Sequence, residues 1–560
     1  MLRRLWAWLD TAAALRCMLW LAPLLLGLIS RTLGQDDNWD LHNYHLYNPF
    51  ALLHGKVGYD LAPGQWQSYF NPTLDLLYYG LVMTLPARVT GLLMGVLHGL
   101  CFVLLAQLGR RLLPTAANGQ PPYRLIIALA WAGCMGPGFI SQLGTTMGDS
   151  STALLVLSAM LLVVRCWPLL QAGGRRGAAA AWSAGLLAGC AAGLKLTNAG
   201  YALALCLSLF ALDAGWRQRW QAVVLIGFGV LGGIAISAGH WYWRMWQVFG
   251  NPLFPQFNDR FPGPLAAPMG VGDSGWLPHG ALEKWFWPFI TTLQPRRISE
   301  LPLRHLIWPM LYTAFAALTL LWITRLLRRR PAPRTMAAPA RMLLWFAALS
   351  YLIWLNLFSI YRYLAPLELL APLMFWLLMA YLLTPAVAQL WSRALLLLAF
   401  SSVLSTASWG RAHWGSQAYE VQTPALPHPE QNMVLVLNAP MGWLATFFPD
   451  QLAFVSLGAG FPESAAYAAR MQAMLAARSG PFYAMLEAEA PPAINAGRQA
   501  ERLQQGAATL ARYELRLDVG NCRTYVALVG RTRHAYQLCP VQPAPLSPLS
   551  PLSPRDSRTR

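Results

Sequence analysis

The densest polar cluster of the chain is the segment Asp36–Gly55, DDNWDLHNYHLYNPFALLHG, which directly follows a long apolar stretch. Its three aspartates stand close to Tyr44 and His45, whereas Ser, Gly and Lys are typical of an ordinary solvated loop. If the segment from Asp40 to His45 is helical, Asp40, Asn43 and Tyr44 share one face. A partly desolvated carboxylate here could accept a proton from a hydroxyl group, or hold a divalent metal ion against a phosphate. Spacing alone does not decide between the three aspartates, Asp36, Asp37 and Asp40.

Four further charged residues stand at short turns or beside apolar segments. Lys195 is the only lysine near a predicted span; a charge there tends to be functional, although snorkelling to the outer surface explains it equally well. Arg362 lies between two tyrosines at a short outer turn; a guanidinium suits bidentate binding of phosphate oxygens, and a role as an anchor at the membrane interface stays open. Glu368 follows two turns later. Asp149 precedes Ser-Ser-Thr, where it could also cap a helix.

The composition indicates the scaffold that must position these residues. Of 560 residues, 56% are hydrophobic and only 12% are charged, about half the charged fraction of a soluble domain. Apolar runs long enough to cross ~30 Å of hydrocarbon recur along the first 410 residues, which predicts a multi-pass, all-α membrane protein. The net charge of +19 lies in short arginine clusters between these runs, as in cytoplasmic loops, so it does not indicate nucleic-acid binding.

We predict eleven spans, with the N-terminus in the cytoplasm and the C-terminus outside. This orientation places the arginine clusters inside and nearly all acidic residues outside. The predicted spans are 13–33, 89–109, 122–142, 150–167, 179–196, 198–214, 221–243, 305–325, 342–358, 363–383 and 393–409. Two long loops, 34–88 and 244–304, then lie outside. Within the first loop, Asn71–Pro86 is apolar but short, and we expect it to form a helix at the outer membrane face.

The composition changes after the last predicted span. Residues 411–540 combine Ala-rich stretches with three segments of alternating apolar residues, which predicts a small α/β domain outside the membrane. The three segments are 433–438, 513–519 and 524–530. Cys522 and Cys539 flank the last predicted strands, and a disulfide between them would suit an oxidising compartment. The tail, 541–560, is of low complexity and is predicted to be disordered.

The pattern Asp-x-x-x-Tyr-His from Asp40 to His45, followed by NPFALLHG, resembles the first outer loop of GT-C-fold membrane glycosyltransferases. In particular, it is similar to bacterial relatives of the dolichyl-phosphate-mannose protein mannosyltransferases. Similar segments follow in the same order over roughly residues 10–410, and the resemblance rests on this order and on topology more than on one motif. These segments are Thr145–Ala159, Gly193–Asn198, Gly250–Asn258 and Tyr361–Pro372. The family commonly pairs Asp with Glu in this loop, whereas this chain has DDNWD and no Glu.

The resemblance implies an enzyme that moves a sugar from a polyprenyl-phosphate donor to an acceptor hydroxyl of a glycan, lipid or protein. The reaction would take place at the periplasmic face of a bacterial inner membrane. Asp40 is the first candidate for the base, because its spacing to Tyr44 and His45 matches best. The candidate catalytic residues are Asp40, Asp36, Asp37 and His45, and the candidate substrate-binding residues are Tyr44, Asp149, Lys195, Arg362 and Glu368. A divalent cation is an open alternative, with Asp36, Asp37 or Asp149 as its ligands.

Two other functions stay open. A polymerase or ligase of lipid-linked glycans would rely on a large outer loop rich in Arg and His. A secondary transporter would bury polar sites at the membrane midplane and often show repeated halves, whereas here the polar residues gather at one face. The sequence contains no Walker loop and no Rossmann fingerprint, which agrees with a lipid-linked donor rather than a nucleotide sugar.

Overall fold

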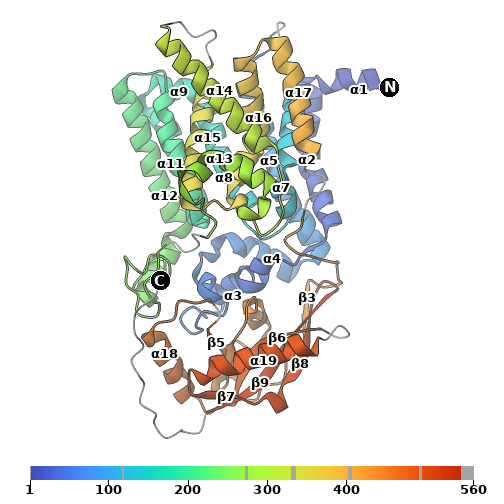
Figure 1. The fold of residues 1–560 in the computed structure, drawn as a ribbon, viewed down its shortest axis with the longest axis vertical. Coiled ribbons are helices and arrows are strands. Elements are labelled where there is room, and N and C mark those ends of the chain that lie inside the picture. The colour runs from blue at the N-terminus through green and yellow to red at the C-terminus, as the bar shows by residue number, and fades with distance from the viewer. Residues whose placement is uncertain are drawn as a thin grey trace.

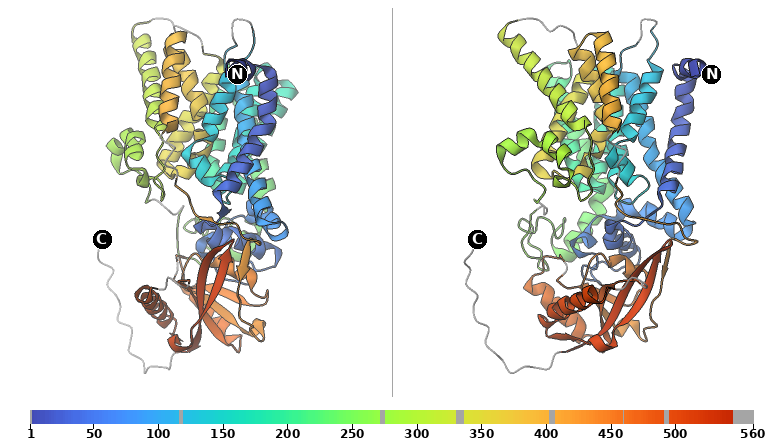
Figure 2. Two further views of the ribbon diagram at one scale, coloured as in Figure 1. Left: turned by 90° about the vertical axis from the view of Figure 1, so that its right-hand side faces the viewer. Right: turned by 45° about the vertical axis from the view of Figure 1, so that its right-hand side comes forward.

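The structure is a computed structural model that describes residues 2–115, 119–270, 275–329, 336–401, 407–458, 460–490 and 495–543. A helical bundle forms one end of the described chain, and a domain built on a β-sheet forms the other (Figure 1). A layer of short helices lies between the two (Figure 2). The bundle ends with α17 (Pro385–Ser401), and the sheet of the second domain begins with β3 (Tyr419–Val421).

Seven helical segments among the described residues are long and apolar enough to cross a membrane, in agreement with a multi-pass membrane protein. They are α2 (Ala12–Leu33), α5 (Ala87–Leu112), α10 (Gly174–Leu194), α12 (Trp216–Phe249), α14 (Ile307–Leu327), α15 (Ala338–Leu357) and the segment Tyr361–Leu382, which contains α16 (Ala365–Leu382). The remaining helices at the predicted spans are α6 (Tyr123–Cys134), α7 (Pro137–Gln142), α8 (Asp149–Arg165), α11 (Ala199–Ser208) and α17. Each predicted span therefore contains a helix, while the number that crosses a bilayer stays a prediction.

Two of the predicted spans differ from the helices that occupy them. The span 122–142 is broken, because α6 ends at Cys134 and α7 begins at Pro137; a proline cannot donate the backbone hydrogen bond that would continue the first helix. The last predicted span, 393–409, falls partly on α17, which already begins at Pro385, a residue that suits the first turn of a helix. Residues 402–406 lie outside the described part of the chain.

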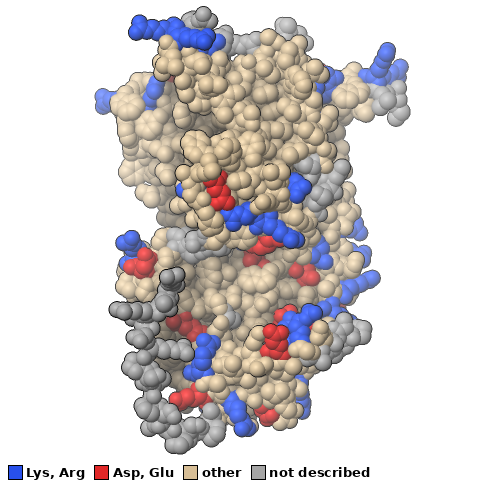
Figure 3. Space-filling model, viewed as in Figure 1, with Lys and Arg blue, Asp and Glu red and all other residues tan. Residues whose placement is uncertain are grey.

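The surface of the bundle is that of a membrane domain. On α12, Phe228, Leu231 and Ile236 are 62%, 63% and 68% exposed, which a water-soluble surface rarely tolerates over so long a helix. Few charged side chains appear on the bundle face shown in Figure 3, apart from Lys and Arg at its upper end. Both signs of charge gather where the bundle meets the lower domain.

Small residues bring α10 and α12 together. Gly185 and Gly189 of α10 face α12 directly, and a Cβ on Gly189 would lie only 2.1 Å from the Val230 carbonyl oxygen. This is the close backbone approach that small residues four positions apart permit between membrane helices. The contact fixes the end of α10, directly before Lys195.

The C-terminal domain is a mixed sheet with two helices. Within the described residues the sheet has the strand order β3-β8-β9-β6-β4-β5, with β7 paired to β9. Its further elements are β4 (Met433–Val436), β5 (Ala453–Ser456), α18 (Ala465–Ala476), β6 (Phe482–Ala488), α19 (Ala496–Ala511), β7 (Leu515–Leu517), β8 (Arg523–Val529) and β9 (Thr532–Pro543). Strand β4 runs parallel to β5 and β6, and the other pairs are antiparallel. Strands β4, β7 and β8 lie on the three segments predicted from alternation.

A disulfide joins Cys522 and Cys539, as expected from their places beside the last strands. It connects the residue before β8 to the middle of β9. The predicted tail, 541–560, begins inside β9, because residues 541–543 are the end of that strand. Residues 544–560 lie outside the described part of the chain.

The first outer loop, 34–88, forms the layer between bundle and sheet. Its β1 (Gln35–Asp36) pairs with β2 (Arg411–Ala412), and it continues through the π-helical turn η1 (Leu41–His45), α3 (Tyr47–Leu53) and α4 (Asp75–Thr84). A buried ion pair, Lys56 with Asp60, bonds this layer to the sheet domain: Lys56 Nζ donates to the Leu452 carbonyl, and Asp60 accepts from the backbone N–H of Phe454. The helix expected within Asn71–Pro86 is α4; its place at the membrane face stays a prediction.

Candidate functional site

A cavity of about 300 Å³ lies where the first outer loop meets the ends of α10 and α12 and the turn before α16. Trp39, Asp40, Tyr44 and His45 line it from the loop, Lys195 from the end of α10, and Arg362 from the short turn η7 (Tyr361–Leu364). Its ionisable lining includes Asp40, Tyr44, His45, Asp75, Lys195 and Arg362. All of these except Asp75 are candidate site residues predicted from the sequence, and the fold brings them together from segments far apart in the chain.

Asp40 and Arg362 form an ion pair in this cavity. The Asp40 Oδ2 and Arg362 Nη1 atoms are 2.5 Å apart, and the side chains are 12% and 15% exposed. Burial alone would raise the pKa of Asp40, but the charges of Arg362 and His45 outweigh it and hold the pKa below its usual value. The guanidinium also lies over the rings of Tyr363 and Trp409. Asp40 is therefore an anion that is paired with a buried cation.

Lys195 is held in the same region by two oxygens. Its Nζ lies 2.7 Å from Asp149 Oδ1 and donates to the Met147 carbonyl at 2.6 Å. Asp149 is the first residue of α8 and follows Gly148, which adopts a left-handed conformation and acts as the cap. Asp149 is thus a partner of the cavity lysine, while it does not line the cavity among the described residues.

His45 and Tyr44 belong to the π-helical turn η1, a form often found at functional sites. The Nδ1 of His45 lies 2.8 Å from Asp75 Oδ1, and the rings of Tyr44 and His45 are 4.1 Å apart. Burial raises the pKa of Asp75. Asn43 does not share a face with Asp40 and Tyr44 as expected, since its side chain instead donates to the Gly64 carbonyl. The wider turn of a π-helix changes which residues align along the helix.

Three predicted site residues have other partners and do not line the cavity among the described residues. Asp36 accepts hydrogen bonds from the backbone and the hydroxyl of Thr146. Asp37 lies beside two histidines, His42 and His534. Glu368 accepts from the first backbone N–H groups of α7 and from a tyrosine hydroxyl, so it holds α7 to α16. These contacts position helices and loops, and a substrate contact by any of the three stays a prediction.

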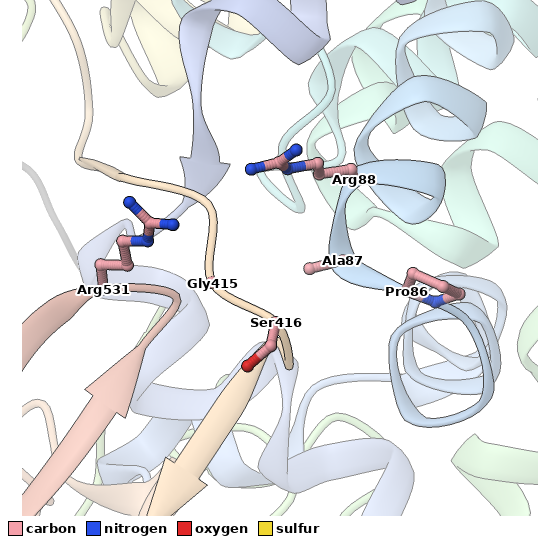
Figure 4. A pocket seen from close by; sticks show the side chains of 6 residues that line it. All are labelled: Pro86, Ala87, Arg88, Gly415, Ser416 and Arg531. Carbon is pink, nitrogen blue, oxygen red and sulfur yellow. The ribbon is translucent and has the colours of Figure 1, made fainter.

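A second cavity, of about 340 Å³, lies between the start of α5 and the turn joining β8 to β9 (Figure 4). Arg88 and Arg531 enter it from opposite sides. Both arginines are exposed, and none of the described residues that line this cavity is acidic. Among the described residues, this second cavity is therefore lined by cationic side chains but by no carboxylate that could act as a base, whereas the cavity at Asp40 is lined by both.

No family model, curated protein or solved structure matches this chain. The functional interpretation therefore depends on the cavity at Asp40 and on the motif resemblance. The one signal for Asp75 in the sequence is that it is an acidic residue of the first outer loop. Its pairing with His45 could not be predicted, because the two residues are 30 positions apart and meet only when the loop folds back on itself.

Proposed function

We propose that this protein is an integral membrane glycosyltransferase that moves a sugar from a polyprenyl-phosphate donor to an acceptor hydroxyl. The observation that carries the proposal is the Asp40–Arg362 pair in a cavity that Lys195 also lines. A carboxylate suits proton transfer from a hydroxyl group, and two neighbouring cations suit a phosphate. Such a set is what transfer from a lipid phosphate requires, and the resemblance of the first outer loop points the same way.

In the proposed reaction, the phosphate of the donor binds between Arg362 and Lys195. It competes with Asp40 for the guanidinium, and this frees the carboxylate to accept the proton of the acceptor hydroxyl. The acceptor oxygen then attacks the anomeric carbon from the side opposite the phosphate, so that the configuration inverts. The bond between this carbon and the phosphate oxygen breaks, and polyprenyl phosphate leaves with the electron pair. Its charge is stabilised by the two cations, which are already in place.

Apolar side chains complete the cavity. Trp66, Phe70, Trp241, Phe254 and Phe358 line it beside the charged groups, as is usual for a pocket that buries most of a ligand and orients it through a few polar contacts. Trp39 also lines it and is 44% exposed. In the proposal, these rings contact the sugar and the first isoprene units.

We place the reaction at the periplasmic face of a bacterial inner membrane. The arginine clusters favour a cytoplasmic N-terminus, and the disulfide between Cys522 and Cys539 suits an oxidising compartment. Alkaline phosphatase fused after Gly410 should therefore be active in whole cells, and a fluorescent protein fused after Leu327 should be fluorescent in the cytoplasm. The reverse result at both points would contradict this orientation and the periplasmic site with it.

The direct test of the proposed activity is transfer by the purified protein. We expect it to consume polyprenyl-phosphate sugars and to leave nucleotide sugars unchanged, because in the proposal Arg362 and Lys195 bind the single phosphate of a lipid donor.

A further inference from the structure

A second polar cluster lies outside the cavity, at the contact between the first outer loop and the C-terminal domain. It consists of Asp37 and His42 from the loop and His534 from strand β9. Asp37 Oδ1 lies 2.8 Å from His42 Nε2 and 3.0 Å from His534 Nε2. One oxygen and two nitrogens thus converge within 4.8 Å of one another, from segments about 500 positions apart.

Hydrogen bonds do not fully account for this cluster. His42 Nε2 is buried and lies 2.8 Å from Asp37 Oδ1, yet it has no hydrogen-bond partner of good geometry among the described residues, whereas His534 Nε2 forms a hydrogen bond with the same oxygen. An unpaired buried polar atom is costly. The ring is held in this orientation by stacking on Trp443, with ring centroids 4.8 Å apart.

A metal ion would account for the geometry. Two imidazole nitrogens and one carboxylate oxygen are a common set of protein ligands for Zn²⁺, with a fourth position left for water. Bonds of about 2.0–2.1 Å in a tetrahedral site place neighbouring ligand atoms roughly 3.3 Å apart. The two distances from Asp37 to the histidines, 2.8 and 3.0 Å, are a few tenths of an ångström shorter, and the two histidine nitrogens lie within 4.8 Å of each other, so binding requires small shifts of these side chains. When two ligand atoms bind the same metal ion, their lone pairs point at the ion. The two atoms can therefore lie close together without the alignment that a hydrogen bond between them would need.

The burial and charge of the ligands also fit. The side chains of Asp37 and His42 are 9% and 8% exposed, whereas that of His534 is 34% exposed and leaves a path from solvent. As ligands, the Asp37 carboxylate would be ionised and the two imidazoles neutral, which is the form in which these groups bind a metal ion.

We propose that Asp37, His42 and His534 bind a divalent transition-metal ion of the zinc class, which ties the first outer loop to the C-terminal domain. Two of its ligands stand on either side of Asp40 in the chain. The ion would therefore position the segment that carries Asp40 and Tyr44, without touching the cavity itself. This proposal does not depend on the proposed glycosyl transfer.

Metal content of the full-length protein tests the inference. The protein, purified in detergent, is stripped with a chelator, dialysed against Zn²⁺ alone, and measured by mass spectrometry of the metal. We expect about one Zn²⁺ per chain in the unchanged protein, and loss of at least 90% of it in His534→Gln and in Asp37→Asn. Co²⁺ as a second probe should give the strong visible absorption of four-coordinate cobalt in the unchanged protein only.

His54→Gln is the matched control. His54 also joins the loop to the C-terminal domain, through Asp450 at 2.8 Å, but it lies outside the cluster. This variant should keep its Zn²⁺. Zn²⁺ should also raise the Tm of the unchanged protein and of His54→Gln, but not that of His534→Gln, since a ligand stabilises only a chain that binds it.

Two results would overturn the proposal. One is an unchanged protein that takes up no Zn²⁺ and shows no shift in Tm. The other is equal uptake by the unchanged protein, His534→Gln and Asp37→Asn, which would place the metal elsewhere and leave the cluster as a hydrogen-bonded contact. Because the His534 side chain is partly exposed, we expect His534→Gln to fold normally, and Asp37→Asn keeps the size of the side chain.

Discussion

Asp40→Asn should lower the turnover of sugar transfer by about 100-fold or more, while the protein still folds and inserts. The amide keeps the size of the carboxylate and its ability to contact Arg362, but it cannot accept the proton of the acceptor hydroxyl. Loss of a general base commonly costs a factor of this order. The measurement is initial-rate kinetics with purified protein at saturating donor, and the loss should appear in kcat rather than in the KM for the donor.

Asp40→Asn also leaves a buried cation without its counter-ion, and a control must separate this effect from loss of the base. Asp60→Asn does so, because Asp60 is the partner of another buried cation, Lys56, outside the cavity. It should lower the Tm and leave kcat within about threefold of the unchanged protein. Equal losses of kcat in both variants would mean that ion pairing, rather than proton transfer, is what Asp40 contributes.

Lys195→Met should weaken the use of the donor. The unbranched thioether fills much of the same volume, so the change removes one charged contact to the donor phosphate and also leaves Asp149 without its cationic partner. A hydrogen bond to a charged group contributes about 1.5–3 kcal/mol, so kcat/KM for the donor should fall by about 10- to 100-fold. Steady-state kinetics with varied donor and fixed acceptor should show a higher KM for the donor and an unchanged KM for the acceptor.

The matched control is Lys56→Met, which removes the other buried lysine that pairs with an aspartate. Lys56 does not line the cavity among the described residues. This change should lower the Tm without raising the KM for the donor. If Lys195→Met left donor kinetics unchanged, Lys195 would serve only to hold Asp149 and the start of α8.

Much of the site could be predicted because membrane topology limits where polar residues can meet. Asp40 and Arg362 are 322 positions apart, but both stand at ends of predicted spans on the same side, as does Lys195. A chain that must satisfy its backbone within helices can place such residues only at one of two faces. The order of the spans was therefore enough to predict that these three belong together.

Other parts could not be predicted because they depend on contacts with no local signal. Strands β1 and β2 have two residues each, so the docking of the first outer loop on the C-terminal domain leaves almost no periodicity to detect. In the sequence, His534 is an ordinary residue of a strand. Only the docking of the first outer loop on the C-terminal domain places it beside Asp37. Glu368 is a candidate substrate-binding residue in the sequence, and only the break between α6 and α7 creates the backbone N–H groups that it accepts from.

The measurement that tests the central claim most directly is a donor comparison with the protein reconstituted in lipid. Labelled sugars are offered either on polyprenyl monophosphate or on a nucleotide, with an extract of the bacterial envelope as acceptor. We predict that label passes from the lipid donor alone, that one polyprenyl phosphate is released per sugar transferred, and that Asp40→Asn reduces both. Transfer from nucleotide sugars, or growth of a ladder of glycan products from a lipid-linked oligosaccharide without use of the monophosphate donor, would contradict the account.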